Sequence, residues 1–255
     1  MAKVIVVANQ KGGVGKTTTS INLSAYLADL KKKTLLIDCD PQGNASSGVG
    51  IDKESCEASV YNLLINGESA NENTVDTQYK NLKVIPSDVD LAGAEIELVS
   101  VKDREFLLKE KLKEIKDDYD FIIIDCPPSL GLLTLNAFAA ADSVIIPIQC
   151  EYYALEGLGS LTKTVSTIKQ SINKNIEIEG ILLTMFDKRT NLSTVVYDEV
   201  KKYFPDKVYK TVIPRNVRLS EAPSFGEAII SYDRFSKGAQ SYKALAKEVI
   251  KNNKE

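Results

Sequence analysis

The segment Asn-Gln-Lys-Gly-Gly-Val-Gly-Lys-Thr-Thr, residues 9–18, constrains the fold more than any other part of the chain. It follows an apolar run at residues 4–8 and precedes a stretch with helical periodicity. A strand, a glycine-rich turn, Lys-Thr and a helix predict a phosphate-binding loop, in which backbone N–H groups and the positive end of the helix dipole surround phosphate oxygens. We therefore expect Lys16 to reach the β- and γ-phosphates and the Thr17 hydroxyl to ligate Mg²⁺.

The loop departs from the usual spacing at its start. Gly, four residues and Gly-Lys-Thr would put the first glycine at position 10, but Gln10 stands there and a second lysine, Lys11, follows it. Lys11 could reach a nucleotide held by a second copy of the chain, as an arginine finger does, or it could be a solvated loop lysine. The residues expected to line the nucleotide site are Lys11, Gly12, Gly13, Val14, Gly15, Lys16, Thr17 and Thr18.

Strand and helix signals alternate along the whole chain, which predicts an α/β fold with a doubly wound, mostly parallel sheet flanked by helices. We expect one P-loop domain over residues 1–255. The expected strands are 4–8, 34–37, 82–85, 121–124, 144–148, 178–184 and 208–212. The expected helices are 16–30, 59–65, 91–99, 104–116, 132–141, 154–172, 192–204 and 237–251, with loops at 66–78 and 215–226.

Composition excludes several classes of function. The chain has no histidine, which removes Ser-His hydrolysis and most transition-metal sites and leaves acid–base work to carboxylates, lysine or substrate phosphate. Its four cysteines are widely spaced without a Cys-x-x-Cys pair, so they are expected to be buried thiols rather than ligands of zinc or an iron–sulfur cluster. No apolar run approaches the length of a membrane span, and we expect a cytoplasmic protein.

Three carboxylates follow predicted strands. Asp125 follows the apolar run at 121–124, as a Mg²⁺-holding Walker B carboxylate does, although a strand-end aspartate can also simply cap a turn. Asp38 and Asp40 flank Cys39 after the second strand and are expected to point the same way. Ligands of such sheets bind beyond the carboxyl ends of the strands, so all three can approach a metal and a γ-phosphate. The implied reaction is phosphoryl transfer to water, in which one of Asp38 and Asp40 orients the metal shell and the other the attacking water.

The net charge of -3 hides an uneven distribution. Residues 185–255 carry 14 Lys and Arg against 9 Asp and Glu, whereas residues 1–184 carry 18 against 26. An acidic front and a basic back are compatible with a local anion-binding face, and equally with ordinary solvated helix surfaces.

Several motifs together resemble the ParA/MinD family of deviant Walker ATPases. They are Lys-Gly-Gly-Val-Gly-Lys-Thr-Thr, Leu-Ile-Asp-Cys-Asp-Pro-Gln-Gly-Asn and Ile-Ile-Ile-Asp-Cys-Pro-Pro-Ser. The segments at 147–157, 184–191 and 213–223 are similar to the small chromosomal ParA branch called Soj. The resemblance runs from about residue 3 to residue 251, and the joint order of the motifs makes it specific.

The resemblance implies a role for each loop and strand-end residue. Lys11 becomes the signature lysine that contacts the partner subunit's ATP in a nucleotide-sandwich dimer. Gly12 lies where the two loops approach, so a side chain there should obstruct dimerisation. Asp40 matches the carboxylate that activates the attacking water, while Asp38 and Asp125 belong to the Mg²⁺ environment.

The resemblance also implies partners for the second half of the chain. Pro214 and Asn216 match a segment that lies against adenine. Arg189, Arg215 and Arg218 match regions implicated in non-specific binding of double-stranded DNA by the ATP dimer, although Arg215 and Arg218 could instead order their own loop through Glu221. The implied protein is a slow ATPase on the nucleoid whose hydrolysis is stimulated by a ParB-type centromere-binding partner.

Four alternatives remain at this stage. A MinD-like membrane ATPase would end in a basic amphipathic helix, but the last helix here lacks Phe and Trp and is expected to dock on the domain. An iron–sulfur carrier would need Cys-x-x-Cys, and a larger plasmid ParA would need a DNA-reading domain before the loop. A binding switch with negligible turnover conflicts with the intact Asp40.

Overall fold

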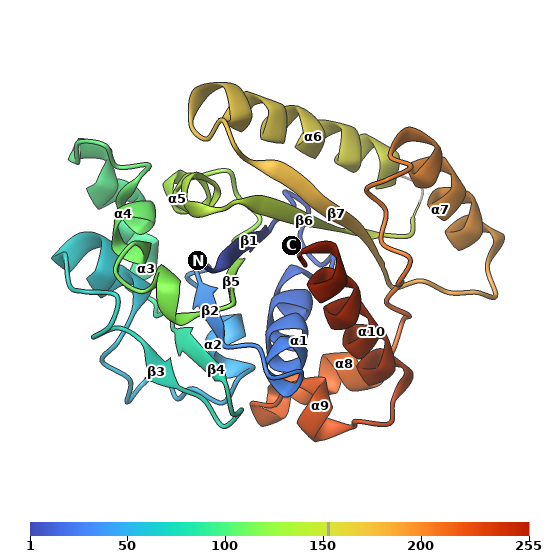
Figure 1. The fold of residues 1–255 in the computed structure, drawn as a ribbon, viewed down its shortest axis with the longest axis horizontal. Helices are drawn as coiled ribbons and strands as arrows, with labels where there is room; N and C mark the ends of the chain where they lie inside the picture. Colours follow the sequence, from blue (N-terminus) through green and yellow to red (C-terminus); the bar gives the residue numbers. More distant parts are fainter. Residues whose placement is uncertain (152–153, 255) are drawn as a thin grey trace.

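A computed structural model describes residues 1–151 and 154–254, so Tyr152 and Tyr153 of the 147–157 motif and Glu255 lie outside the described residues. The chain builds a seven-stranded sheet with the strand order β3-β4-β2-β5-β1-β6-β7 (Figure 1). All neighbouring strands pair in parallel except β3 and β4, which are antiparallel. This confirms the predicted mostly parallel sheet. The strands are β1 Lys3–Val7, β2 Thr34–Asp38, β3 Val75–Asp76, β4 Leu82–Ile85, β5 Phe121–Asp125, β6 Ser143–Gln149 and β7 Glu177–Thr184.

Helices cover both faces of the sheet (Figure 1). One face packs against α1 (Lys16–Asp29), α2 (Asn44–Ser47), α8 (Val217–Glu221), α9 (Ile229–Tyr232) and α10 (Lys237–Asn252). The other face packs against α3 (Leu91–Glu97), α4 (Leu107–Leu112), α5 (Leu132–Ala140), α6 (Ala154–Ser171) and α7 (Asn191–Tyr203). Short 3-10 or π turns are η1 Asn62–Asn66, η2 Leu98–Ser100, η3 Lys116–Asp118 and η4 Ala222–Phe225.

The central strands form because both of their faces are covered. Every residue of β5 is buried, and its near-continuous apolar sequence is typical of a parallel strand between two helix layers. Residues of β1 that face opposite sides, such as Ile5 and Val6, accordingly belong to different core clusters. In the register of β2 and β5, Asp38 lies opposite Asp125. The sheet therefore brings two of the predicted carboxylates together at its carboxyl edge.

Helix α10 uses its apolar face for packing, as the sequence predicted. Its residues Tyr242, Leu245, Ala246 and Val249 are buried in the cluster that contains α1. The Tyr242 hydroxyl also lies 3.1 Å from the Thr19 hydroxyl of α1. The final helix is thus part of the folded core rather than a free amphipathic segment.

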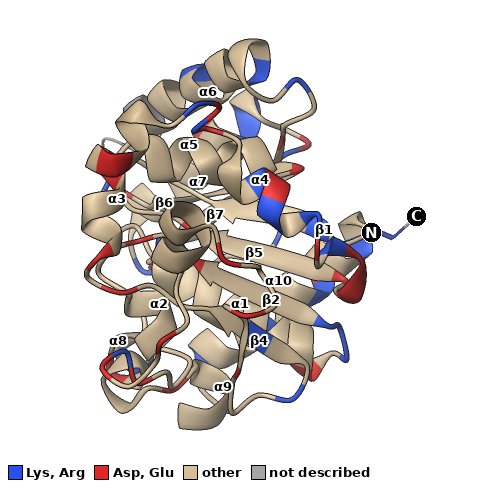
Figure 2. Ribbon diagram, turned by 90° about the vertical axis from the view of Figure 1, so that its left-hand side faces the viewer, with Lys and Arg blue, Asp and Glu red and all other residues tan. Residues whose placement is uncertain are grey.

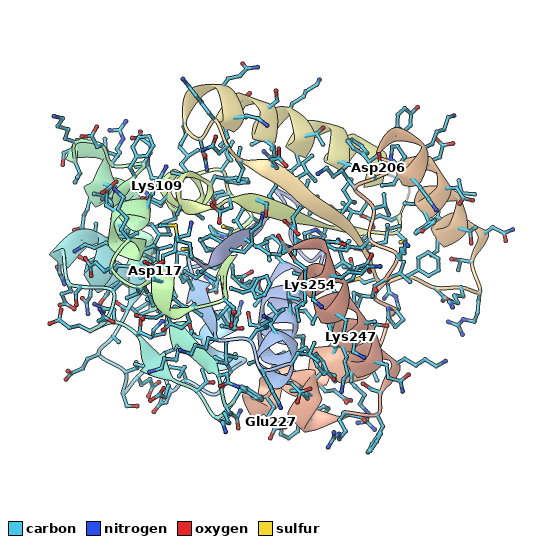
Figure 3. The ribbon with its side chains drawn as sticks, viewed as in Figure 1. Lys109, Asp117, Asp206, Glu227, Lys247 and Lys254 are labelled. Atoms are coloured by element: carbon cyan, nitrogen blue, oxygen red, sulfur yellow. The ribbon has the colours of Figure 1, made fainter. Side chains whose placement is uncertain are left out.

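The two ends of the chain emerge on the same side of the molecule (Figure 2). Met1 and Lys254 line one hollow there, at the amino edge of the sheet. The charged side chains labelled Lys109, Asp117, Asp206, Lys247 and Lys254 in Figure 3 lie on the outside of the molecule and are exposed. The outer surface therefore carries both positive and negative side chains.

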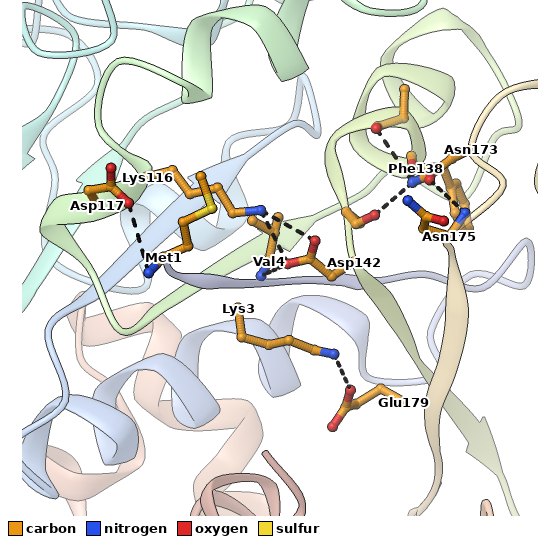
Figure 4. A network of polar contacts seen from close by, with 12 residues as sticks. Met1, Lys3, Val4, Lys116, Asp117, Phe138, Asp142, Asn173, Asn175 and Glu179 are labelled. Carbon is orange, nitrogen blue, oxygen red and sulfur yellow. Dashed lines mark hydrogen bonds and ion pairs between the residues drawn. The ribbon is translucent and has the colours of Figure 1, made fainter. Parts of the chain in front are cut away.

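Polar contacts hold the amino edge of the sheet (Figure 4). The Val4 N–H donates to Oδ2 of Asp142 at 2.8 Å, and Lys116 forms an ion pair with the same carboxylate. The Lys3 ammonium lies 3.5 Å from Oε2 of Glu179, whose other oxygen accepts from Asn253. These contacts tie β1, β7 and the end of α10 together, and they leave the opposite, carboxyl edge for a ligand.

The predicted strand at 208–212 is wrong. Only one isolated bridge, Ile181 to Val208, connects this segment with β7. The backbone N–H groups of Lys210 and Thr211 donate instead to the Glu248 carboxylate of α10, at 2.8 and 3.1 Å. Because a side chain satisfies these donors, the segment has no need of a continuous ladder with β7.

Two predicted loops contain regular structure, and one predicted helix is shorter. The 66–78 loop includes the edge strand β3, and the 215–226 loop includes α8, which Asn216 caps by accepting from the Arg218 N–H at 2.9 Å. The helix expected over 104–116 is reduced to α4, because Asp103 has a left-handed φ of 54° and the turn after it ends only at Phe106.

Candidate active site

The phosphate-binding loop joins β1 to α1 at the carboxyl edge of the sheet. Gly13 and Gly15 have φ angles of 73° and 89°, a left-handed conformation that side chains disfavour. The turn opens a hollow of 700 Å³ in front of the helix. Its lining includes Gly12, Gly13, Gly15, Lys16, Thr17, Thr18, Asp40, Pro41, Gln42, Asn44, Pro127, Pro128 and Ser129. Most of the predicted nucleotide residues thus meet at one site.

Val14 takes a different position from its neighbours in the loop. Its side chain is 1% exposed and packs in the protein, so only its backbone can face a ligand. Its carbonyl accepts a hydrogen bond of 2.8 Å from the Thr184 hydroxyl at the end of β7. The same hydroxyl lies 3.1 Å from the Ile148 carbonyl of β6. Thr184 therefore ties the loop to two neighbouring strands.

Asn9 holds the other end of the loop. Its amide donates to the Pro147 carbonyl at 2.8 Å, and its side-chain oxygen accepts from the Lys11 N–H at 2.9 Å. The side chain is 6% exposed. Asn9 and Thr184 together preorganise a turn whose glycines would otherwise leave it mobile.

Asp125 carries an unpaired oxygen into the site. Its Oδ1 accepts from the Ser20 hydroxyl of α1 at 2.8 Å, whereas its buried Oδ2 has no hydrogen-bond partner among the described residues. Burial, and then the nearby Asp38 carboxylate, raise the pKa of Asp125, while the hydrogen bond from Ser20 opposes that rise. A buried carboxylate oxygen beside a threonine hydroxyl is a donor set that suits Mg²⁺, which takes one or two protein oxygens together with water and phosphate. The residues present therefore fit the ion.

Asp38 has most of its hydrogen-bonding capacity satisfied within the chain. Its Oδ2 accepts from the backbone N–H and the hydroxyl of Ser46, at 2.8 and 2.7 Å, and its Oδ1 accepts from the Asp40 N–H at 3.2 Å. Burial raises the pKa of this carboxyl, and the Ser46 bonds oppose the rise. Asp38 lies beside Asp125 as predicted, and it also orders the turn that carries Asp40.

Asp40 lines the 700 Å³ hollow together with the loop lysine. One of its oxygens accepts from the Gln42 N–H at 3.0 Å, which fixes the side chain at the rim. Lys16 is 7% exposed, and burial lowers its pKa while the charges of Asp125 and then Asp40 raise it. A cation and a carboxylate thus face the space where a terminal phosphate and a water would meet.

Lys11 projects away from its own loop. Its ammonium pairs with the Glu151 carboxylate, and its carbonyl accepts from the Lys16 ammonium at 3.2 Å. A Cβ built at the neighbouring Gly12 meets nothing within 4 Å, and Gly12 is exposed. Lys11 and Gly12 therefore lie at the open side of the site, where a second molecule can reach them.

Pro214 and Asn216 line a second pocket of 330 Å³ that adjoins the loop. Gly15, Thr18, Met185 and Tyr242 contribute to the same pocket. Met185 has a left-handed φ of 50°, and a bridge from Phe186 to Pro214 holds the two segments side by side. A pocket that shares Gly15 and Thr18 with the phosphate hollow is placed to accept a nucleotide base.

The structure separates the three predicted DNA-binding arginines. Arg189 and Arg215 line a groove of 710 Å³ with Lys188 and Lys237. Arg189 is 88% exposed, and Asp187 holds it through two hydrogen bonds of 3.0 and 2.8 Å. Arg218 lies on α8 outside this groove.

Arg218 has the partner, Glu221, that the alternative interpretation gave it, and Asp233 is a second partner. It forms ion pairs with Glu221 at 2.9 Å and with Asp233 at 3.7 Å. The same Glu221 carboxylate accepts from the Tyr232 hydroxyl. Arg218 thus orders its own loop, and about half of its side chain is still exposed.

Residues 1–151 and 154–254 contain neither a membrane-spanning helix nor a cluster of side chains that could hold a metal ion by itself. None of the helices is long and apolar enough to cross a membrane. The same residues contain no cluster of three or more His, Cys, Asp or Glu side chains arranged to hold a metal ion by themselves. The Mg²⁺ site proposed at Asp125 and Thr17 needs no such cluster, because phosphate and water complete its shell.

Comparison with known proteins gives a consistent result. A family model described as an AAA domain, AAA_31, matches residues 2–178. The sporulation initiation inhibitor protein Soj of Bacillus subtilis is 60% identical over 99% of this chain and 100% of its own length. The chromosome-partitioning ATPase Soj of Treponema pallidum is 54% identical over 98% of both chains. The chain belongs to the ParA/MinD family of P-loop ATPases.

Solved structures agree with this assignment. Cobyrinic acid a,c-diamide synthase from Mycobacterium smegmatis, with a bound ATP analog and magnesium, has a TM-score of 0.86 at 36% identity and covers 98% of this chain and 95% of its own. As a ParA/MinD family ATPase, the chain uses ATP and Mg²⁺ and hydrolyses ATP. The fold class and the family that the sequence motifs predicted are confirmed.

Sequence reasoning missed Asn9, Ser20, Ser46 and Thr184 of this ParA-type site. Ser20 and Ser46 bond to the two buried aspartates, and Asn9 and Thr184 anchor the loop. One signal was available for Thr184, because it ends a predicted strand as Asp125 does. The roles of the other three depend on contacts between distant segments.

Proposed function

We propose that this chain is a nucleotide-operated, DNA-binding ATPase of chromosome or plasmid partitioning. ATP closes a homodimer, the dimer binds double-stranded DNA without sequence preference, and a ParB-type partner stimulates hydrolysis and release. Support comes from the names of its relatives, which include a chromosome-partitioning ATPase. The observation that carries the proposal is that the Lys11 ammonium pairs with Glu151 and does not line its own phosphate hollow.

The dimer proposal rests on Lys11 and Gly12. In the single chain Lys11 pairs with Glu151, and both side chains are partly exposed, so the pair is weak enough to exchange for a phosphate. Lys11 then contacts the ATP of the second subunit, while the two exposed Gly12 residues permit close approach of the loops. The nucleotide becomes both substrate and part of the interface.

Hydrolysis is assigned to residues around one hollow. Lys16 neutralises charge on the terminal phosphate, and Asp40 orients the attacking water from the rim. Thr17 and Asp125 would hold Mg²⁺, which supplies further charge neutralisation when bound. Asp38 keeps the Asp40 turn in place by accepting from the Asp40 N–H, while Ser46 holds its other oxygen.

DNA binding is assigned to the groove that contains Arg189 and Arg215. Two further cations, Lys188 and Lys237, line it, so one groove gathers four basic residues that a phosphate backbone can contact. Asp187 occupies Nε and Nη2 of Arg189, but the remaining guanidinium donors are free for a phosphate. Arg218 contributes from α8 through its exposed part. A dimer doubles this charge, which makes binding ATP-dependent and places the protein in the cytoplasm on the nucleoid.

The test is retention on DNA with ADP, with ATP, and with ATP for the variant Asp40→Ala, at several salt concentrations. We expect retention only with ATP, a steep decrease with salt, and persistence for Asp40→Ala after wild type has released. Arg189→Glu should keep ATP-driven dimerisation and lose retention.

Lys109→Glu provides the matched control, because Lys109 is an exposed lysine on α4, in a different part of the fold from the groove (Figure 3). It makes the same change of charge. If Arg189→Glu and Lys109→Glu reduce retention equally, the groove is not the DNA site. If wild type is retained equally with ADP and ATP, the switch itself is refuted. Because α10 buries its apolar face, no observation on the described residues favours a MinD-like membrane function.

A further inference from the structure

An exposed apolar stripe runs along α3 and the turn on either side of it. We define the stripe as Val89, Ala92, Ile96 and Val99. Val89, Ile96 and Val99 are 78%, 77% and 59% exposed, and Ala92 is exposed as well. Ala92 and Ile96, four residues apart, lie on one side of α3, and Val89 and Val99 continue the row into the turn before α3 and the 3-10 turn η2 after it.

The opposite side of the same helix already has a partner. Leu91, Ala94 and Leu98 are fully buried against the core. The stripe is therefore not needed to hold α3 on the sheet. Three large apolar side chains exposed in one row differ from the single exposed residues that any surface carries, and such rows mark interaction surfaces.

The flanks of the stripe along α3 and the turn before it are acidic, whereas at its far end the Arg104 guanidinium donates to the Val99 carbonyl. Asp88, Asp90, Glu95 and Glu97 lie within or beside it, and residues 88–97 contain no lysine or arginine. Figure 2 views this side of the molecule, with Asp and Glu in red. An apolar stripe with acidic flanks is complementary to a helix that has its own apolar stripe and flanking Lys or Arg.

The helix that carries the stripe also contacts the nucleotide site. Ala92 and Glu95 line the 700 Å³ hollow of the phosphate loop. The Glu95 carboxylate accepts from the N–H groups of Leu132 and Leu133, at 2.8 and 3.3 Å, and so holds the start of α5. A Cβ at Gly131 would lie 2.2 Å from Oε1 of Glu95, which shows how closely the two segments meet. The start of α5, which Glu95 holds, is the next element in the chain after β5, the strand that ends at Asp125.

We propose that the stripe docks a helical segment of the ParB-type partner that stimulates hydrolysis, with apolar residues at spacings of three and four and with basic flanks. This rests on the proposed function, which requires such a partner. A second copy of the chain fits the stripe poorly, because a two-fold axis would place acidic flanks against acidic flanks. Docking shifts α3. Because Glu95 of α3 holds the start of α5, the shift reaches residues 127–131, which lead from the Asp125 strand to α5.

The experiment measures ATP turnover with ATP and DNA while purified ParB-type protein is titrated. Val99→Asp and Ile96→Asp are compared with wild type and with Val195→Asp. Val195 is the matched control because it is 56% exposed, close to the 59% of Val99, and lies on α7. We expect at least a tenfold rise in the partner concentration for half-maximal stimulation in the two stripe variants, with unchanged thermal melting, basal turnover and ATP-dependent DNA retention.

Each other outcome overturns the inference in a recognisable way. Stimulation of Val99→Asp and Ile96→Asp at the wild-type partner concentration shows that the partner docks elsewhere, while the proposed function stands. If both stripe variants lose ATP-driven dimerisation and Val195→Asp does not, the stripe is an interface between two copies of the chain. If wild type itself is neither stimulated nor retained on DNA, the proposed function fails and the docking proposal fails with it.

Discussion

The hydroxyl of Thr184 offers a sharp test of how the phosphate loop is held. Thr184→Val keeps the shape of a 2% exposed side chain and removes its only donor, which bonds the Val14 carbonyl at 2.8 Å and approaches the Ile148 carbonyl at 3.1 Å. Leaving a buried carbonyl without its donor costs ~1–3 kcal/mol. For a chain of this size each kcal/mol lowers the melting temperature by roughly 2–4 °C.

The same bond should affect ATP binding, because it selects the loop conformation that the phosphates need. If about 1 kcal/mol of preorganisation is lost, the apparent Kd for ATP rises about fivefold. We expect Thr184→Val to show both effects, measured by thermal melting without nucleotide and by titration with a fluorescent ATP analogue. The chemistry residues Lys16 and Asp40 are unchanged in this variant, so any loss reports on positioning.

Two variants control the Thr184 experiment. Thr184→Ser keeps the hydroxyl and should remain close to wild type in ATP affinity. Thr167→Val makes the same chemical change on the exposed side of α6, where the hydroxyl donates to the Lys163 carbonyl of its own helix. If Thr184→Val binds ATP as wild type does and melts at the same temperature, the anchoring role given to this residue is wrong.

Three further substitutions test the other assignments. Lys16→Ala should weaken ATP binding by at least about tenfold in the same titration, since it removes the buried cation of the loop; unchanged affinity would remove the phosphate-loop assignment. Asp40→Ala should reduce turnover in a phosphate-release assay by about 10²-fold or more while ATP still binds, and full turnover would refute its role with water. Gly12→Val should leave melting intact, because a Cβ there meets no protein atom within 4 Å, but should prevent the ATP-dependent dimer seen by light scattering; a normal dimer would contradict the close approach of two loops.

The phosphate loop and the carboxyl-edge acids could be predicted from the sequence because their chemistry is local. A strand, a glycine turn and Lys-Thr lie within a few residues of one another, and the left-handed Gly13 and Gly15 are a property of that short segment. The position of Asp125 at a strand end follows equally from an apolar run and parallel-sheet topology. Element positions were correct wherever periodicity was strong, as for α1 and α10.

Prediction failed where a distant side chain decided the local structure. The 208–212 segment reads as a strand, but Glu248 of α10 takes its amides. The sequence offered Glu221, three residues away, as a partner of Arg218, but it did not show that Arg189 and Arg215 share a groove or that Asp233 also pairs with Arg218. Local propensity carries no information on such partners, because they depend on which helix packs beside the segment.

The sequence by itself determined that this chain has a nucleotide loop with a surplus lysine, Lys11, and a family in which to place it. Only the tertiary structure decided that Lys11 pairs with Glu151 and that Thr184 anchors the loop. It also decided that α3 exposes an apolar stripe with acidic neighbours at the rim of the site. The reason is physical. The type and spacing of residues set the chemistry available, whereas burial, pairing and exposure arise when segments far apart in the chain pack against one another.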